Sequence, residues 1–182
     1  MAQLIQVKGK EFVDKILRGE RDFLEIELEE GFNFHICERA KELDEYLRQH
    51  NHQVEPFCIS RSRFRNIAAT RLHFPCLRAL AVDFSNTNLS WSYFDSSFLK
   101  GANLTNTLLN EACLHNADLM YADFSGASLF QTDFRYASLL SVKNLQSAEN
   151  LDTALFYQTK VAKNEREIIE KALKEKLFVD FH

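Results

Sequence analysis

The most regular feature of the chain is a large apolar residue at every fifth position between residues 84 and 139. A small or compact residue stands two positions before each of them. Neither the period of a helix nor that of a strand produces this spacing. A chain that turns a corner every five residues would produce it, because the small and the large residue of each unit then both point inward. The large residues are Phe84, Leu89, Phe94, Leu99, Leu104, Leu109, Leu114, Leu119, Phe124, Leu129, Phe134 and Leu139.

The individual units closely resemble those of the pentapeptide repeat family, and the chain is similar to the small cytosolic members of that family in bacteria. Ala102-Asn103-Leu104-Thr105-Asn106 and Ala122-Asp123-Phe124-Ser125-Gly126 are examples. The resemblance implies a β fold, a right-handed quadrilateral β-helix with four of these five-residue units in each coil. With this coil length the register extends upstream, so that we expect a regular solenoid over residues 57–141.

Residues separated by one full coil should stack on one wall. This stacking predicts a core ladder, mostly of phenylalanine, on two opposite walls. Its members are Phe64, Phe84, Leu104 and Phe124 on one wall and Phe74, Phe94, Leu114 and Phe134 on the other. A core filled in this way leaves no room for a cofactor.

A second ladder is predicted at one corner, where Asn66, Asn86, Asn106 and Gly126 follow one another at intervals of one coil. Stacked asparagines could bind a ligand. Asn and Gly are also the residues that adopt turn conformations at least cost, and we prefer this structural interpretation.

The ends of the repeat require additional elements, since an open solenoid end would pair with another chain. We expect an N-terminal cap helix in residues 1–20, first repeat units in 21–34, a helical insertion in 35–56, and a C-terminal cap and helix in 142–182. A candidate capping box, Asn164-Glu165-Arg166-Glu167, predicts where the C-terminal helix opens. The insertion either covers the first coil or forms a binding element.

Charge is unevenly distributed along the chain, which has a net charge of −4. Residues 57–80 contain five arginines and no acid, namely Arg61, Arg63, Arg65, Arg71 and Arg78. This band would wrap several walls instead of lining one face, so nucleic-acid binding is not favoured. We expect the arginines to pair with acidic residues of the adjacent coil, which are Glu25, Glu27, Glu29 and Glu30.

Catalytic motifs are absent from the sequence. It has no GxSxG, HExxH, P-loop or GxGxxG pattern, and its cysteines and histidines lack the spacing of metal ligands. We therefore predict no catalytic, cofactor-binding or metal site, and no enzymatic activity. With no signal peptide and no long apolar run, the protein is expected in the cytoplasm with reduced thiols, away from membranes.

Several apolar side chains should project outward from the wall that bears Leu99 and from a neighbouring corner. They form a candidate interaction surface of Leu80, Tyr93, Phe98, Met120, Tyr121, Tyr136 and Leu140. Such a surface either binds a partner or is covered by the C-terminal segment or the inserted helix. We predict a non-enzymatic protein-interaction scaffold or adaptor whose protein partner the sequence does not identify.

Two further expectations concern partners. Some members of the family act as DNA mimics that bind type II topoisomerase (gyrase), and the resemblance implies this role as the alternative function. It needs a continuous acidic strip, whereas Asp83, Asn103 and Asp123 stack on a wall interrupted by Arg63. Family members often dimerise through a terminal cap, and the apolar residues 177–181 make a homodimer through the C-terminal cap a second expectation.

Overall fold

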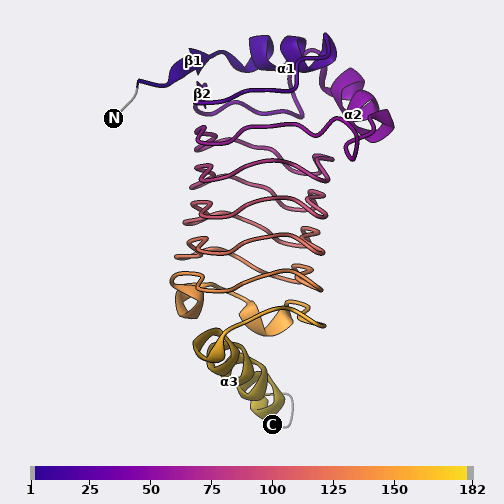
Figure 1. Cartoon of the computed structure of the whole chain (residues 1–182). Coiled ribbons are helices and arrows are strands. Elements are labelled where there is room, and N and C mark those ends of the chain that lie inside the picture. Colours follow the sequence, from indigo (N-terminus) through magenta and orange to yellow (C-terminus); the bar gives the residue numbers. More distant parts are fainter. Residues whose placement is uncertain (1–2, 180–182) are drawn as a thin grey trace.

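The computed structural model describes residues 3–179, with side chains described as far as residue 174. The chain winds into a stack of coils (Figure 1). In the regular part of the stack, parallel bridges join residues that are 20 positions apart, and these bridges form four columns. Each coil therefore has four sides. We number these sides as the first to fourth walls in chain order. The bridging residues point outward. They are Cys58, Arg78, Phe98, Asp118 and Ser138 on the first wall, Arg63, Asp83, Asn103, Asp123 and Lys143 on the second, Ala68, Asn88, Leu108 and Ser128 on the third, and His73, Tyr93, Cys113 and Asp133 on the fourth.

Backbone hydrogen bonds between successive coils hold each wall together. On the second wall the amide of Asn103 donates to the carbonyl of Val82 at 2.9 Å, and the amide of Phe84 donates to the carbonyl of Asn103 at 2.9 Å. These bonds satisfy the backbone groups of each wall without long strands, because the chain leaves the wall after three residues to turn a corner.

The corners require a left-handed backbone at the fifth residue of each unit. Asn66, Asn86 and Asn106 have φ between 54° and 56°, and Gly126 has φ 61°. The Asn106 amide donates to Oδ1 of Asn86 at 3.1 Å. A Cβ at Gly126 would lie 2.5 Å from Oδ1 of Asn106, so glycine leaves room for the ladder below it. This arrangement favours the structural interpretation of the asparagine ladder.

The interior is filled with apolar side chains. All eight residues of the core ladder are buried, and the most exposed of them, Phe74, is 8% exposed. Rings from the second and fourth walls meet across the axis, with centroids 6.4 Å apart for Phe84 and Phe94 and 5.9 Å apart for Phe124 and Phe134. A purely apolar cavity of about 30 Å³ remains among the phenylalanines of the N-terminal coils. A void of this size holds at most a water molecule and is far too small for a cofactor.

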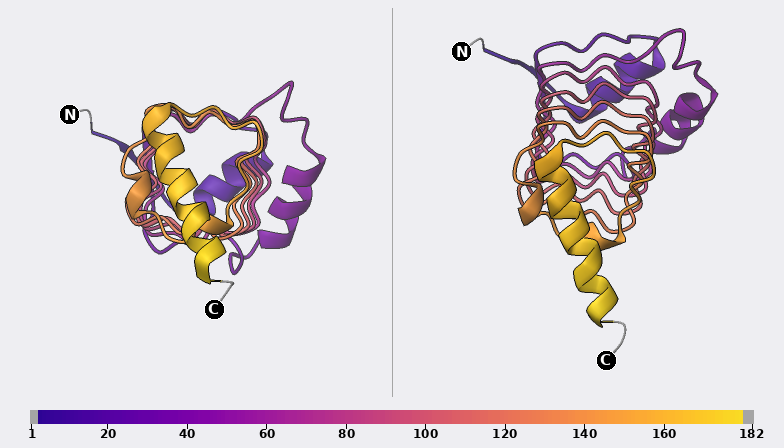
Figure 2. Two further views of the ribbon diagram at one scale, coloured as in Figure 1. Left: turned by 90° about the horizontal axis from the view of Figure 1, so that it is seen from below. Right: turned by 60° about the horizontal axis from the view of Figure 1, so that its bottom comes forward.

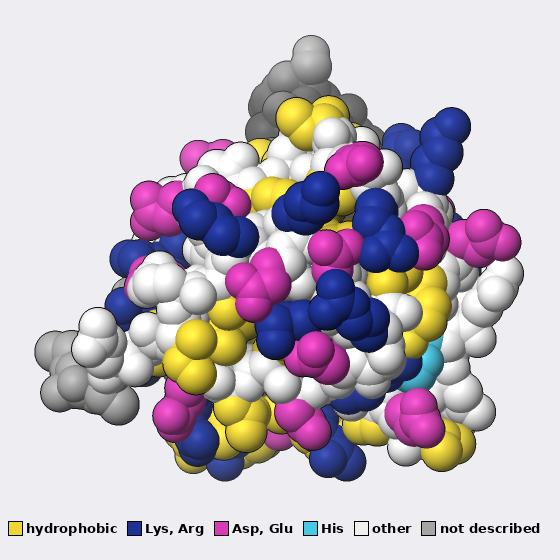
Figure 3. Space-filling model, turned by 90° about the horizontal axis from the view of Figure 1, so that it is seen from above, with side chains coloured by type: hydrophobic (Ala, Val, Ile, Leu, Met, Phe, Trp, Pro, Cys, Tyr) yellow, Lys and Arg dark blue, Asp and Glu magenta, His cyan; other side chains and the backbone are white. Residues whose placement is uncertain are grey.

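Helix α1 (Gly9–Leu17) and strand β1 (Ile5–Val7) cover the N-terminal end. Strand β1, which the sequence analysis did not predict, pairs in parallel with β2 (Ile26–Leu28) on the second wall. Helix α1 crosses the open coil (Figure 2) and buries Phe12, Val13 and Ile16. Seen from outside, this end carries acidic and basic side chains intermixed (Figure 3), a surface that discourages stacking of solenoids end to end.

The insertion replaces one side of the first coil. Asp22, Glu27 and Asn33 bridge to the first three walls of the next coil, and the bridges of the fourth wall begin only at His73. Asn33 and its partner Ala68 are 35 residues apart instead of 20. Helix α2 (Ala40–Gln49) occupies this extra length outside the outline of the coil (Figure 2) and buries Leu43 and Leu47.

The C-terminal region begins with one further coil, in the segment expected to cap the solenoid. Lys143, Glu149, Leu155 and Lys160 continue the four columns of bridges, with 3-10 turns at Leu145–Ser147 and Leu151–Thr153. Leu145 and Leu151 are buried in this coil, whereas Leu155 points outward and is 47% exposed.

Helix α3 (Lys163–Val179) crosses the C-terminal end of the stack (Figure 2). It begins before Asn164, which therefore lies in its first turn and does not precede the helix as a capping residue. Among the described residues, no helix combines the length and the apolar character needed to cross a bilayer.

Candidate functional site

The seven residues of the candidate interaction surface lie on the first wall, the fourth wall and the corners that adjoin the first wall. Five of them are between 41% and 56% exposed, and Met120 and Leu140 are half-buried. Their exposed fractions show that neither helical addition buries them. Helix α3 crosses the end of the stack and α2 flanks the first coils (Figure 2). The surface is open to solvent in this chain.

Charged residues divide this surface. Lys100 stands between Leu80 and Met120 in the column after the first wall, and its Nζ lies 5.4 Å from the ring centroid of Tyr121 as a cation–π contact. Phe98, 56% exposed, bridges to Arg78 in the preceding coil and to Asp118 in the following one. The surface is therefore a set of apolar side chains rimmed by charges, a pattern typical of transient protein contacts.

Aromatic rings extend the surface at the corner between the fourth and first walls. The ring of Tyr136 lies 5.1 Å from His115 and 5.6 Å from Tyr157. Tyr157, 60% exposed, was missed by the sequence analysis because it lies in the irregular last coil. Tyr93 stands apart on the fourth wall, 5.4 Å from the ring of His73.

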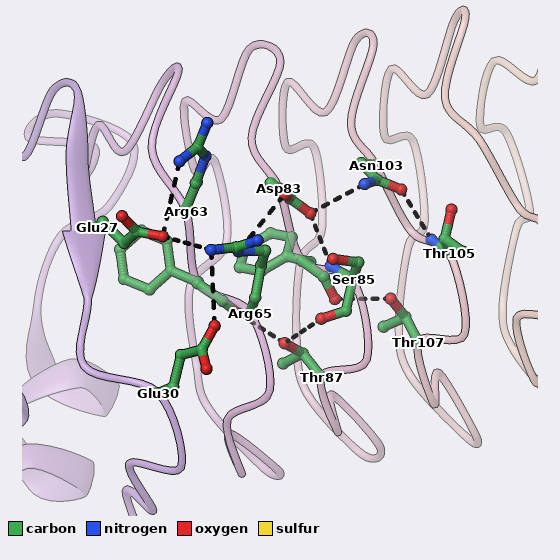
Figure 4. A network of polar contacts seen from close by, with 12 residues as sticks. Glu27, Glu30, Arg63, Arg65, Asp83, Ser85, Thr87, Asn103, Thr105 and Thr107 are labelled. Carbon is green, nitrogen blue, oxygen red and sulfur yellow. Dashed lines mark hydrogen bonds and ion pairs between the residues drawn. The ribbon is translucent and has the colours of Figure 1, made fainter. Parts of the chain in front are cut away.

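Three arginines of the basic band form ion pairs with the first coil, and Figure 4 shows those of Arg63 and Arg65. Arg65 lies 2.5 Å from Glu27 and 3.6 Å from Glu30, and Arg63 lies 3.7 Å from Glu27. A hydrogen bond from Gln6, followed by the contact with Arg65, holds the pKa of Glu27 below its usual value. Arg61 pairs with Glu25 at 2.8 Å. These arginines join coils, as expected, although Glu29 pairs with Lys8 instead.

The other two arginines of the band, Arg71 and Arg78, do not form such ion pairs with the described residues. The guanidinium of Arg71 lies 5.4 Å from the ring centroid of Trp91. Within the described part of the chain, neither Arg71 nor Arg78 has a carboxylate at ion-pair distance. Both are exposed, Arg71 at the corner between the third and fourth walls and Arg78 on the first wall.

A groove that the sequence analysis did not predict runs between α2 and the solenoid. It has a volume of about 290 Å³. Buried Phe34, Leu43 and Leu72 contribute to its lining, and its polar lining comes from His35, Lys41, Asp44, Arg48 and Arg71. Lys41, Asp44 and Arg48 are spaced along one face of α2, so a charge pattern on that helix was visible in the sequence. That these charges lie beside Arg71 could not be predicted, because the path of the insertion is not determined by the repeat.

Histidines gather on the other side of α2. The His52 ring lies 4.8 Å from that of His50 and 5.6 Å from that of His73. Burial lowers the pKa of His52 to about 4 and also lowers that of His73. Nε2 of His52 lies 2.7 Å from the Leu47 carbonyl, which ties the loop to α2. Among the described residues, no group of three or more His, Cys, Asp or Glu side chains could hold a metal ion.

The cysteines have no arrangement suited to nucleophilic chemistry. All four are free. Burial raises the pKa of Cys113 to about 12, and its thiol donates a hydrogen bond to Oδ1 of Asp95 at 3.1 Å. Such a thiol is not ionised at neutral pH and is a poor nucleophile.

Comparison with known proteins identifies the repeat. The family model described as "Pentapeptide repeats" matches residues 83–119 and 97–135, with 8 copies. No curated protein matches the chain.

Among solved structures, the pentapeptide repeat protein Rfr23 from the cyanobacterium Cyanothece 51142 is 18% identical, covering 79% of this chain and 86% of its own, with a TM-score of 0.37. QnrB1, a plasmid-mediated fluoroquinolone resistance protein, is 16% identical, covering 84% of this chain and 82% of its own, with a TM-score of 0.36. A pentapeptide repeat protein from the thylakoid lumen of Arabidopsis thaliana is 22% identical, covering 68% of this chain and 82% of its own, with a TM-score of 0.28.

Proposed function

Because this chain belongs, through residues 83–135, to the pentapeptide repeat family, we propose that it is a non-enzymatic protein-interaction scaffold. The observation that carries the proposal is the contrast between a core filled with apolar side chains and outer walls that expose aromatic ones. The filled interior leaves no pocket inside the coils in which a nucleophile, a base and an oxyanion site could converge. Family membership also carries the expectation of a right-handed coil.

The contact surface in this proposal is centred on Phe98 and Tyr121. Large aromatic side chains contribute much of the binding energy of protein interfaces, and charged residues usually form the rim around them.

A capture experiment tests this surface. The purified chain, immobilised and incubated with lysate of the native host, should retain a protein partner that is lost when Phe98→Asp and Tyr121→Asp are combined. Leu108→Asp provides a matched control, because Leu108 is similarly exposed on the opposite, third wall. The proposal fails if the double variant and the control retain the same proteins, or if the control alone loses them.

The alternative function, a DNA mimic that binds gyrase, has weaker support. Its acidic strip would follow the second wall through Asp83, Asn103 and Asp123. Arg63 precedes this column and Lys143 follows it, so cations interrupt the strip on both sides. A gyrase supercoiling assay separates the two functions, since a DNA mimic inhibits supercoiling or protects the enzyme and a scaffold without affinity for gyrase does neither.

Assembly and location complete the proposal. Residues 177–181, which the homodimer hypothesis invokes, have side chains outside the described residues. A chain truncated after Lys176 should change its solution mass from dimer to monomer if those residues form the contact. An unchanged mass eliminates them. We place the protein in the cytoplasm, because four free cysteines suit a reducing compartment.

A further inference from the structure

The groove between α2 and the solenoid combines an apolar floor with basic side chains at its edge. Phe34, Leu43 and Leu72 contribute to the floor, and all three are buried. Lys41 and Arg71 stand on opposite sides, the first on α2 and the second at the corner between the third and fourth walls. The groove is open and its volume of about 290 Å³ accommodates one or two side chains.

The charges around the groove are not balanced within the chain. Arg48 and Asp44 neutralise each other at 3.0 Å. Elsewhere in the region cations are paired, with Lys10 on Glu38 at 2.9 Å and Arg39 on Asp14 at 2.6 Å. Lys41 and Arg71 have no such carboxylate partner among the residues that the structure describes. On a chain whose net charge is −4, the groove is a local positive site.

The ring of Trp91 packs against the guanidinium of Arg71. The guanidinium lies 5.4 Å from the ring centroid of Trp91, so the ring restricts where it can point while its N–H groups remain free to donate. A guanidinium held in this way binds a carboxylate through two parallel hydrogen bonds.

Trp91 itself has φ 60° and is 43% exposed. Arg71 and Glu111, one coil away on either side in the same column, have the same left-handed backbone, with φ 57° and 56°. The tryptophan therefore stands at an ordinary corner position, directly beside Arg71.

We propose that this groove binds an acidic peptide segment, with one apolar side chain on the floor and flanking carboxylates on Arg71 and Lys41. The site is separate from the Phe98 and Tyr121 surface, and the proposal goes beyond the scaffold function. Positive charge on both sides selects an acidic partner, and the apolar floor selects a segment with a hydrophobic anchor. Ile36, 82% exposed and adjacent to His35 in the lining, extends the apolar contact beyond the groove.

The single tryptophan of the chain provides a direct test, because Trp91 lies beside the groove. The probes are synthetic nonapeptides of alternating Asp and Glu with a central Leu, Ile, Phe or Val, and the same peptides with Lys in place of every acid. At least one acidic peptide should produce a saturable change in Trp91 emission below about 1 mM, and none of the basic peptides should do so. Failure of the whole acidic set, or equal binding of the basic set, overturns the proposal.

Charge reversal locates the site. By anisotropy of the labelled peptide, Arg71→Glu should weaken binding by at least about tenfold and Lys41→Glu by about threefold or more. Arg78→Glu is the matched control, an exposed arginine on the first wall, and should change affinity by less than about twofold. Equal effects of Arg71→Glu and Arg78→Glu refute the groove. Circular dichroism checks that each variant is folded.

The two surfaces can be tested independently. The Phe98→Asp and Tyr121→Asp double variant should bind the acidic peptide as the unaltered chain does. Loss of peptide binding in that variant places the peptide on the first wall and overturns the groove proposal. Failure of the partner-capture experiment leaves the peptide result unaffected.

Discussion

The two ends of the solenoid present the same physical problem, an exposed apolar coil with unpaired backbone groups, and the chain covers them unequally. At the N-terminal end, α1 packs Phe12 against Phe23 and Phe64 with ring centroids 4.7 Å and 5.3 Å apart. At the C-terminal end, Ile169 is the one buried apolar residue among the described side chains of α3, and Leu173 remains 38% exposed. The comparison indicates that the N-terminal cap is part of the hydrophobic core, whereas α3 buries little apolar surface against the coils.

Polar groups reinforce the difference. Arg39 at the start of α2 pairs with Asp14 of α1 at 2.6 Å, so the cap and the insertion support each other. At the other end, the carboxylate of Glu165 is buried and its Oε2 has no hydrogen-bond partner among the residues that the structure describes. A buried oxygen without a partner weakens the contact that contains it. We therefore expect local unfolding to begin with α3.

Removal of the Phe12 ring should have the largest effect. Phe12→Ala deletes a ring packed on three other phenylalanines beside an existing cavity, and should lower the free energy of unfolding by about 3–5 kcal/mol. Guanidinium unfolding followed by circular dichroism measures the loss. A loss no greater than that caused by Ile169→Ala would contradict the comparison of the two ends.

The second-largest effect should be a loss of stability of the N-terminal region at low pH. Burial lowers the pKa of folded His52 to about 4, below the unfolded value near 6.5, so folding favours the neutral ring. This contribution is complete above about pH 6.5 and is lost as the pH falls toward 4, by about 3 kcal/mol in total. Urea unfolding at several pH values measures it.

His52→Gln should remove most of this dependence. His115→Gln, far from the insertion, should leave it in place. Amide exchange at pH 4.5 should show opening of α2 before any change in the last coil. A pH profile unchanged by His52→Gln would refute the assignment.

A smaller effect is expected where α1 begins. A Cβ on Gly9 would lie 1.9 Å from Cδ2 of Phe32, so Gly9→Ala must displace that ring and should cost about 1–2 kcal/mol. Gly101→Ala is a useful comparison, because nothing lies within 4 Å of its Cβ and only its φ of 67° opposes alanine. Thermal unfolding should show the greater loss of stability for Gly9→Ala. The reverse order would show that the Phe32 ring can move aside at little cost.

The smallest effect should come from α3. Ile169→Ala should cost only about 1 kcal/mol, at or below the low end for such truncations, because the site is beside solvent and can collapse. Hydrogen exchange should show faster opening of α3 with the coils 57–141 unaffected. A global loss of stability comparable to that of Phe12→Ala would mean that α3 belongs to the core after all.

The regular coils could be predicted because one register determines every inward position. Once Phe84 and Leu104 are placed one coil apart, the buried positions of Ile59, Ala69 and Ala79 follow without further assumptions. Strand β1 could not be predicted in this way, since so short a strand carries no usable alternation. The register of the last coil could not be predicted, because its two 3-10 turns change the spacing between units.

The candidate surfaces were predictable to different degrees. The interruption of the apolar surface by Lys100 follows from the same coil spacing that places Leu80 and Met120. The groove does not follow from any spacing, because α2 is joined to the solenoid by loops whose path depends on tertiary contacts such as that of His35 with Thr70 at 2.5 Å. Periodicity thus defines the walls, and only the folded chain shows what an insertion places beside them.

The bridging of each coil to the next also determines how a partner must recognise this molecule. Phe98 and Tyr121 come from successive circuits of the chain, and the groove joins α2 to Arg71, which lies well beyond that helix in the sequence. Neither surface exists in any short stretch of the polypeptide. A synthetic fragment of this chain should therefore fail to compete for a partner, and antibodies raised against the native protein should mostly lose their epitopes when it is denatured.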